Sequence, residues 1–209
     1  LVRLEEAIAS AEKAVEVNPD DSYAHAVYAF ALDWKASYVV DDRERQAMLT
    51  KSEQEAVRAL QLDNTNTLAL AFYAEVLVDQ QKWTQAQQNI EQALERDPSL
   101  MDVHRVHAYV LESLGEYALA IEAYDRAIAI APNLTFLYLR AGAVYRRLAF
   151  ESPNEQVQRQ LYEKSLEYFA QTARINQQLG VQDPAPYLSI ARTYSQMGEF
   201  FIAIRNVQK

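Results

Sequence analysis

Residues 83–98 read WTQAQQNIEQALERDP, and residues 117–132 read YALAIEAYDRAIAIAP. The second stretch begins 34 residues after the first, and similar residues occupy the same places in both. Self-similarity at a fixed period predicts repeated structural units that stack on one another. The matched pairs are Trp83 with Tyr117, Ala86 with Ala120, Ile90 with Tyr124, Ala93 with Ala127, Pro98 with Pro132, Ala74 with Ala108 and Leu77 with Leu111.

The period continues in both directions, and at two places it is lengthened by 11 residues. Ala14 lies 45 residues before Ala59, and Tyr162 lies 45 residues after Tyr117. Eleven residues make about three helical turns, so we interpret both insertions as longer helices. Ser152-Pro153-Asn154-Glu155 predicts one helix start, with Ser152 as the cap and Glu155 closing a capping box. Asp41-Asp42-Arg43-Glu44 is a weaker version of the same signal.

Each unit carries two stretches whose apolar residues follow a helical period, and the chain has only 4 Gly and 6 Pro to interrupt them. The residue before a proline disfavours α geometry, so helices should end near the closing prolines. We therefore predict a lone helix and five antiparallel helix pairs. The lone helix spans about 3–17, and the pairs span 22–40 with 43–62, 67–80 with 83–96, 101–114 with 117–130, 135–150 with 154–178, and 185–197 with 200–209.

These features resemble the tetratricopeptide repeat family. Its signature positions are a small residue in each first helix, turn glycines at Gly115 and Gly198, an aromatic residue that opens the second helix, and closing prolines. The resemblance implies an all-α, right-handed superhelical array over residues 1–209, an α-solenoid that serves as a protein–protein interaction scaffold. The family's usual tryptophan early in the first helix is absent. The residues in its place are His25, Leu70, His104, Tyr138 and Tyr187.

Composition narrows the possible functions. The net charge is −9, and residues 1–100 hold 18 acidic against 9 basic residues, so nucleic acid is not an expected partner. No apolar run is long enough to span a membrane, and the absence of cysteine excludes thiolate chemistry. We assign His104 and His107 to packing, because no third metal ligand accompanies them. We expect no catalytic residue, metal or cofactor, and a soluble protein with the cytoplasm slightly favoured.

A second stripe on each first helix should face a partner polypeptide, because the family lines its concave groove this way. Its N-terminal part is aromatic and acidic, and its C-terminal part gathers arginines, which suit carboxylates. We hypothesise an extended acidic peptide with its apolar anchor near Phe30, Trp34 and Phe72. The predicted groove residues are Tyr23, Phe30, Trp34, Phe72, Glu75, Arg105, Tyr109, Arg140, Arg146, Arg147 and Arg192.

Two alternatives stay open. The arginines could instead be solvated or paired with Glu112, Glu116 or Glu151. The chain could be a structural array that forms homo-oligomers through exposed ends or through the edge that carries both insertions, and these insertions could equally be neutral elaborations.

Overall fold

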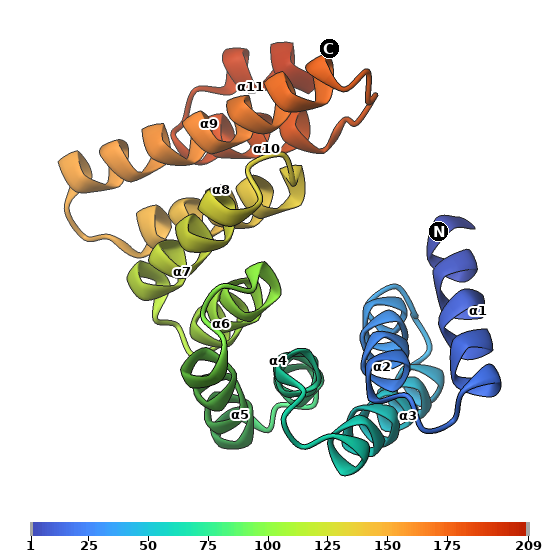
Figure 1. Cartoon of the computed structure of the whole chain (residues 1–209). Helices are drawn as coiled ribbons and strands as arrows, with labels where there is room; N and C mark the ends of the chain where they lie inside the picture. Colours follow the sequence, from blue (N-terminus) through green and yellow to red (C-terminus); the bar gives the residue numbers. More distant parts are fainter. Residues whose placement is uncertain (1, 208–209) are drawn as a thin grey trace. The chain divides into compact units, whose positions relative to one another are not determined.

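The computed structural model describes residues 2–207, and these residues contain α-helices and no strand (Figure 1). The eleven helices of this range are α1 Val2–Val17, α2 Ser22–Ala36, α3 Asp42–Leu62, α4 Thr67–Asp79, α5 Trp83–Arg96, α6 Met101–Ser113, α7 Tyr117–Ile130, α8 Thr135–Glu151, α9 Glu155–Gln178, α10 Ala185–Gln196 and α11 Phe200–Val207. The all-α prediction is confirmed. The predicted helix 22–40 is too long, because α2 ends at Ala36 and Asp41 takes extended geometry to cap α3.

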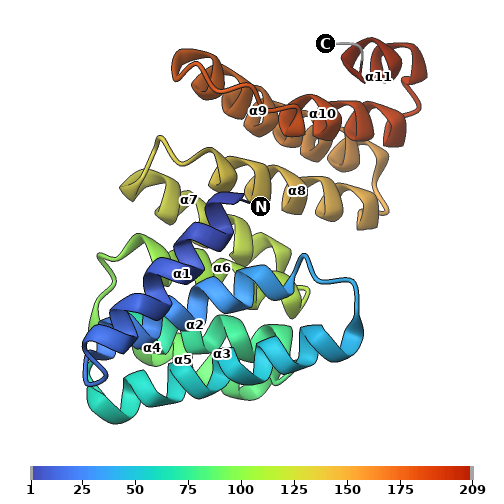
Figure 2. The ribbon, with the colours of Figure 1, turned by 90° about the vertical axis from the view of Figure 1, so that its right-hand side faces the viewer.

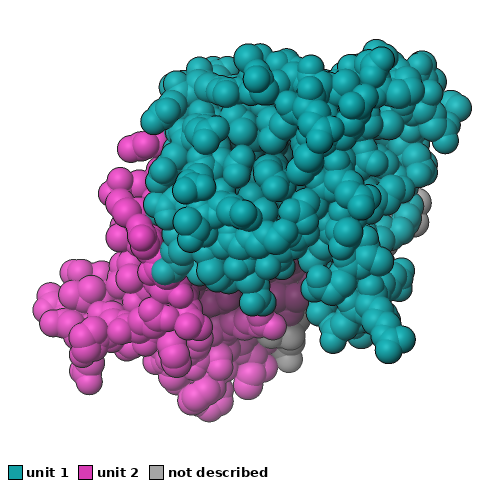
Figure 3. Space-filling view, turned by 90° about the horizontal axis from the view of Figure 1, so that it is seen from below, with its two compact units in different colours: residues 1–114 teal, residues 115–209 magenta. Residues whose placement is uncertain are grey.

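The chain divides into two compact units, coloured separately in Figure 3. Unit 1 is Leu1–Leu114 and unit 2 is Gly115–Lys209, so the division falls inside the third predicted pair, at a glycine with φ +80°. The sequence predicted one continuous array over residues 1–209.

Within each unit, helices pair and the next first helix packs on the preceding pair (Figures 1 and 2). In unit 1, α2 pairs with α3 and α4 with α5; α4 packs on α2 and α3, and α6 packs on α4 and α5. In unit 2, α8 pairs with α9 and α10 with α11, while α10 packs on α8 and α9. Each pair thus buries its apolar face against a neighbour, as quasi-one-dimensional repeat proteins do.

Small residues set the close approach of the paired helices. Ala29, Ala74 and Ala108 have no exposed surface. At the equivalent Gly142, a Cβ atom would lie 2.7 Å from the Phe169 ring, so only glycine fits. The two longer pairs share a further contact: Ser52 Oγ donates to the Ala29 carbonyl at 2.7 Å, and its counterpart in α9 donates to the Gly142 carbonyl at 2.8 Å.

The residues that replace the family tryptophan hold the preceding turn. His25 Nε2 and His104 Nε2 lie 2.9 and 2.7 Å from the carbonyl oxygens six residues earlier, at Pro19 and Pro98. Tyr138 Oη donates to the corresponding carbonyl at 3.0 Å. A polar ring atom at this place therefore satisfies a backbone acceptor that the turn leaves without a helical partner.

Both insertions lengthen helices, as predicted. The helices α3 and α9 have 21 and 24 residues, against 14 in α5 and 14 in α7. The predicted cap of α9 is wrong: Ser152 ends α8, and Asn154 caps α9 by accepting from the backbone N–H groups of Gln156 and Val157. Asp41 caps α3, as the weaker signal predicted.

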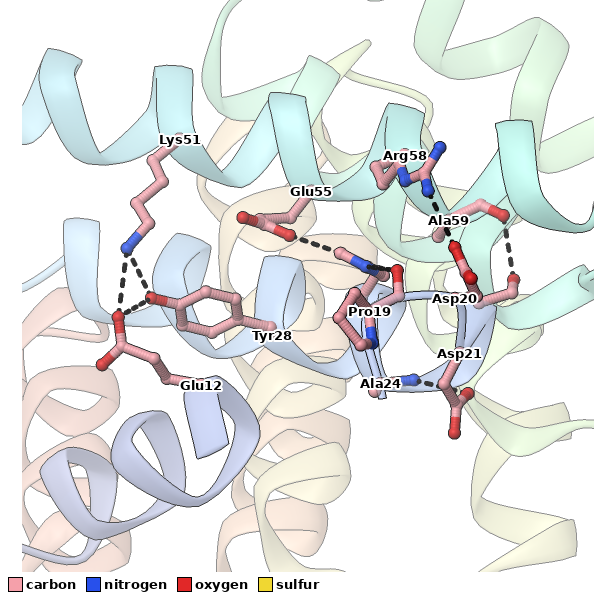
Figure 4. Close-up of polar contacts among 12 residues, drawn as sticks. Glu12, Pro19, Asp20, Asp21, Ala24, Tyr28, Lys51, Glu55, Arg58 and Ala59 are labelled. Atoms are coloured by element: carbon pink, nitrogen blue, oxygen red, sulfur yellow. Dashed lines mark hydrogen bonds and ion pairs between the residues drawn. The ribbon is translucent and has the colours of Figure 1, made fainter. Parts of the chain in front are cut away.

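The lone helix α1 is held to the first pair by a polar chain (Figure 4). Lys51 Nζ donates to Tyr28 Oη at 2.5 Å, and Tyr28 Oη donates to Glu12 at 2.8 Å. His25 lies between the Pro19 carbonyl and Glu55, 2.6 Å from the carboxylate. These contacts join α1, α2 and α3.

Candidate functional site

The first helices of unit 1 bring a charged pair together on their shared face. Arg105 of α6 donates both terminal nitrogens to the Glu75 carboxylate of α4, each at 2.7 Å, and its Nε donates to Asp102 at 3.1 Å. Arg105 and Glu75 are only 7% and 5% exposed. Burial alone would lower the pKa of Arg105, but Glu75 and then Asp102 raise it above its ordinary value. The guanidinium is therefore engaged inside unit 1, paired with Glu75 rather than with Glu112, Glu116 or Glu151.

An aromatic stack lies under this pair. The Phe30 and Phe72 rings are stacked with centroids 4.7 Å apart, and the Arg105 guanidinium lies 5.0 Å from the Phe30 centroid. Phe72 is buried, whereas Trp34, whose ring is 5.6 Å from Phe30, is 42% exposed. The predicted anchor residues are thus in contact, with Phe72 as the support and Trp34 at the surface.

Beside this stack, α1 and α2 enclose an open pocket of about 440 Å³. Its wall is mostly apolar, and Tyr38, two residues after the end of α2, is 61% exposed. The lining residues are Arg3, Leu4, Ala7, Val27, Phe30, Ala31, Trp34 and Tyr38. Tyr23, at the start of α2, is 58% exposed and does not line the pocket.

The same face carries a buried carboxylate, Asp33 of α2. It is 1% exposed, and its Oδ1 has no hydrogen-bond partner among the described residues. Burial, followed by the charges of Glu75 and Asp79, raises its pKa well above the ordinary value, against an opposing effect of Arg105. Tyr109 of α6 donates to Asp79.

Unit 2 holds the other predicted arginines. Arg146 of α8 is half-buried; its guanidinium lies 5.6 Å from the Phe169 centroid and donates to the Ser189 carbonyl of α10 at 3.4 Å. Burial, and then the positive charge of Arg192, lower its pKa. Arg192 is exposed, and within residues 2–207 neither arginine has a carboxylate within ion-pair distance. The positive charges of these two adjacent guanidinium groups are therefore not balanced by a carboxylate within the described residues.

The remaining two predicted arginines have partners. Arg147 donates to Glu151 at 2.6 Å, which is one of the alternatives expected from the sequence. Arg140 Nε donates to Tyr124 Oη at 3.3 Å. Both arginines are exposed, so these are surface contacts of small energetic weight.

A second pocket, of about 590 Å³, lies on α10 and α11. It gathers the predicted groove residue Arg192 with other residues of α10, and it adds apolar residues of α11. The lining residues are Ala185, Leu188, Ser189, Ala191, Arg192, Ser195, Phe200, Ala203 and Ile204.

Within the described part of the chain, no three His, Asp or Glu side chains are placed to hold a metal ion. His104 is 6% exposed and faces the Pro98 carbonyl, so it has a packing role. None of the helices described is long and apolar enough to cross a membrane.

Helix pairs that recur at 34 residues and stack through small residues define an α-helical repeat protein. Two segments carry the family signature: residues 74–135 match one tetratricopeptide repeat model, and residues 3–21 match another. These two segments of the chain are therefore tetratricopeptide repeats. Proteins built from these repeats are typically scaffolds for protein–protein interaction.

Among known proteins, the human interferon-induced protein with tetratricopeptide repeats 2 is 28% identical over 147 residues, which cover 68% of this chain and 29% of that protein. The structure "Human IFIT1 dimer with PPP-AAAA" is similar with a TM-score of 0.82 and 21% identity, over 98% of this chain and 45% of that one. The structure of pilF from Pseudomonas aeruginosa has a TM-score of 0.62 and 18% identity, over 98% and 81% of the two chains. The chain spans less than half of the two interferon-related proteins, and these structural similarities concern the fold alone.

Proposed function

We propose that the chain is a protein–protein interaction module that holds a partner polypeptide on the exposed faces of its first helices. The observation that carries this proposal is that α2 and α10 present large side chains to solvent: Trp34 is 42% and Leu188 is 49% exposed, and Arg192 lies beside Leu188. Exposed tryptophan and arginine are the residues that dominate binding energy in protein interfaces. In a family of interaction scaffolds, this exposure favours binding over a purely structural role.

Each unit supplies one kind of contact in this proposal. The pocket beside Phe30 and Trp34 takes an apolar side chain, and Phe72 supports the stack from beneath. Acidic residues of an extended partner meet Arg146 and Arg192, whose charges have no intramolecular carboxylate. Arg105 is not available for this role because Glu75 holds it, while Arg140 and Arg147 add positive charge at the surface.

The test is affinity capture of partners followed by calorimetry with a purified partner. Trp34→Ala and the double variant Arg146→Gln/Arg192→Gln should each weaken binding by about tenfold or more, or 1.4 kcal/mol. The arginine variant should also flatten the dependence of affinity on salt. Matched controls are Trp83→Ala, which removes the other tryptophan at a similar 39% exposure, and Arg159→Gln, which removes one exposed charge from α9. Equal losses in the controls and the site variants would defeat the proposal.

A structural, self-assembling array is the second candidate. It is favoured by α11, whose Phe200, Phe201 and Ile204 are 61%, 92% and 58% exposed. The similar IFIT1 structure is described as a dimer of IFIT1. Light scattering on the purified chain distinguishes the candidates, because a stable oligomer that Phe201→Ser dissociates would favour assembly.

The same calorimetry should include PPP-AAAA, the ligand in that IFIT1 structure. Unit 1 carries 20 acidic and 10 basic residues, which opposes a polyanion. We therefore expect no binding of PPP-AAAA at physiological salt. Binding that Arg146→Gln/Arg192→Gln abolishes would assign the arginines to that ligand instead.

A further inference from the structure

His25, in the first turn of α2, has a hydrogen-bond acceptor on each side of its ring (Figure 4). Its Nδ1 lies 2.6 Å from a carboxylate oxygen of Glu55 in α3, and its Nε2 lies 2.9 Å from the carbonyl oxygen of Pro19 in the α1–α2 turn. The side chains of His25 and Glu55 are only 8% and 19% exposed, so little water competes with either contact. The ring therefore ties the turn to α3.

These two contacts need one more proton than a neutral ring and an ionised carboxylate carry. A carbonyl oxygen and a carboxylate only accept, and a neutral imidazole has a single N–H donor. Both contacts form together only when an extra proton lies between Nδ1 and Glu55, on the ring or on the carboxyl group. Without this proton, a nitrogen lone pair faces an oxygen at 2.6 or 2.9 Å, and one of the two contacts opens.

The equivalent places in the next two repeats need no such proton. Leu70 has no ring nitrogen, and His104 contacts the Pro98 carbonyl with Nε2 at 2.7 Å, while its buried Nδ1 has no hydrogen-bond partner among the described residues. Ala123 stands in the repeat of His104 at the position of Glu55. The need for the extra proton is therefore specific to the first pair and is not a property of the repeat itself.

Charged groups of the turn and of α1, α3 and α4 also flank this part of unit 1, and they have partners of their own (Figure 4). These partners are Asp20 with Arg58, Asp21 with the first N–H groups of α2, Glu12 with Lys51, Glu75 with Arg105, and Asp79 with Tyr109. The helix dipole disfavours a positive ring in the first turn of α2. Among the described residues, Glu55 is the carboxylate within ion-pair distance of His25, so the extra proton depends on it.

We propose that the His25–Glu55 pair is a proton-dependent latch, which holds the α1–α2 turn to α3 while it keeps the shared proton and opens one contact when the proton leaves. A proton that the folded pair holds more tightly than the unfolded chain stabilises the folded state at low pH, and this contribution is lost as pH rises. Histidine is the side chain whose charge usually changes between about pH 5 and 8. The latch therefore secures the first helix pair better in mildly acidic than in alkaline solution.

The test is hydrogen exchange of residues 14–22 in the purified chain at two pH values, corrected for the intrinsic dependence of exchange on pH. His25→Leu copies the residue of the second repeat and removes both contacts. Glu55→Gln keeps both contacts on a neutral ring, because the side-chain amide can donate to Nδ1. Two matched controls are His104→Leu, which changes the equivalent histidine, and Asp33→Asn, because the raised pKa of Asp33 gives unit 1 a pH dependence of the same sign.

In the unmodified chain, protection of this segment should fall by about tenfold or more from about pH 5.5 to about pH 8.5, since one proton changes an equilibrium constant by up to about tenfold per pH unit. Both controls should keep this fall. Glu55→Gln should stay protected at both pH values, and His25→Leu should be poorly protected at both. Circular dichroism should show that every variant is folded; if His25→Leu is not, the comparison with Glu55→Gln decides.

Three results would overturn the proposal. Protection that does not change with pH in the unmodified chain would show that the pair holds no exchangeable proton in this range. A fall with pH that Glu55→Gln retains, or that Asp33→Asn abolishes, would assign the effect to another group. Equal protection of His25→Leu and the unmodified chain would show that the turn is held without the ring.

Discussion

Replacing Arg105 by leucine should be the most damaging single change on the face of unit 1. The side chains of Arg105 and Glu75 are 8% and 7% exposed, and two 2.7 Å contacts join them. Arg105→Leu would leave the Glu75 carboxylate buried without a counter-charge, next to Asp33 and Asp79. Removing one partner of a buried ion pair costs about 3–5 kcal/mol. We expect a loss of this size in the unfolding free energy of unit 1.

The double variant separates pairing from burial. Glu75→Leu alone should cost less, because Arg105 keeps Asp102 at 3.1 Å and the Phe30 ring at 5.0 Å. Glu75→Leu/Arg105→Leu should recover most of the loss, since apolar replacement of a buried pair is often neutral or stabilising. The coupling energy from this double-mutant cycle should reach about 2–3 kcal/mol.

Urea unfolding followed by tryptophan fluorescence is the assay. Both tryptophans, Trp34 and Trp83, lie in unit 1, so the signal reports this unit selectively. A loss below about 1 kcal/mol for Arg105→Leu, or additive single losses in the double variant, would refute the reasoning that the pair is desolvated and mutually dependent.

Three further changes test other features. Asp33→Asn should stabilise unit 1 by about 1–3 kcal/mol at pH 7, because burial raises the pKa of Asp33 and ionisation is unfavourable in the folded state. Because the pKa of Asp33 is higher in the folded state, its stabilising contribution is fully present below the unfolded pKa and is lost as pH rises through the folded pKa. The gain in unfolding free energy from Asp33→Asn, measured in urea titrations, should therefore shrink at acid pH. A gain that does not depend on pH would contradict this cause. Gln81→Gly should raise the unfolding free energy by about 1 kcal/mol, because Gln81 has a φ of +61°, a conformation that favours glycine, and the equivalent Gly115 has +80°. An unchanged unfolding free energy would show that the turn is unstrained. Gly142→Ala should lower the unfolding free energy, measured by thermal unfolding, by about 1–3 kcal/mol, because the new Cβ meets the Phe169 ring at 2.7 Å. Phe169→Leu in the same chain should restore part of the loss. A Gly142→Ala variant with unchanged stability would show that the two helices can separate.

Much of the fold could be predicted because packing constrains single positions strongly. Ala74 and Ala108 are completely buried at 34-residue spacing, so the period is visible in the sequence. The predicted end of the helix at residue 40 is wrong, because Asp41 must have an extended backbone to cap α3. A periodic pattern of apolar residues does not reveal where the first helix ends before such a cap. The cap of α9 was misplaced for a similar reason: Ser152 and Asn154 are both good caps, and three-dimensional contacts decide between them.

The candidate site was harder to predict, because its residues act through neighbours that lie far away in the sequence. Arg105 was expected to face a partner, yet Glu75, 30 residues earlier, already neutralises it. Both residues lie on one predicted stripe, but the stripe alone does not say which charges meet. The isolation of Asp33 and the proximity of Arg146 to Arg192 depend on side-chain positions that no local pattern encodes.

The contacts between successive first helices make the repeats non-interchangeable. Glu75 with Arg105 and Asp79 with Tyr109 each join residues 30 positions apart, so α4 is matched specifically to α6, the first helix that follows it. Excising residues 67–100, one whole period, would keep the spacing but set Arg105 opposite α2, which has Phe30 where α4 has Glu75. Protein engineers who recombine such modules would therefore have to transfer adjoining helices together, since equal length does not make two modules compatible.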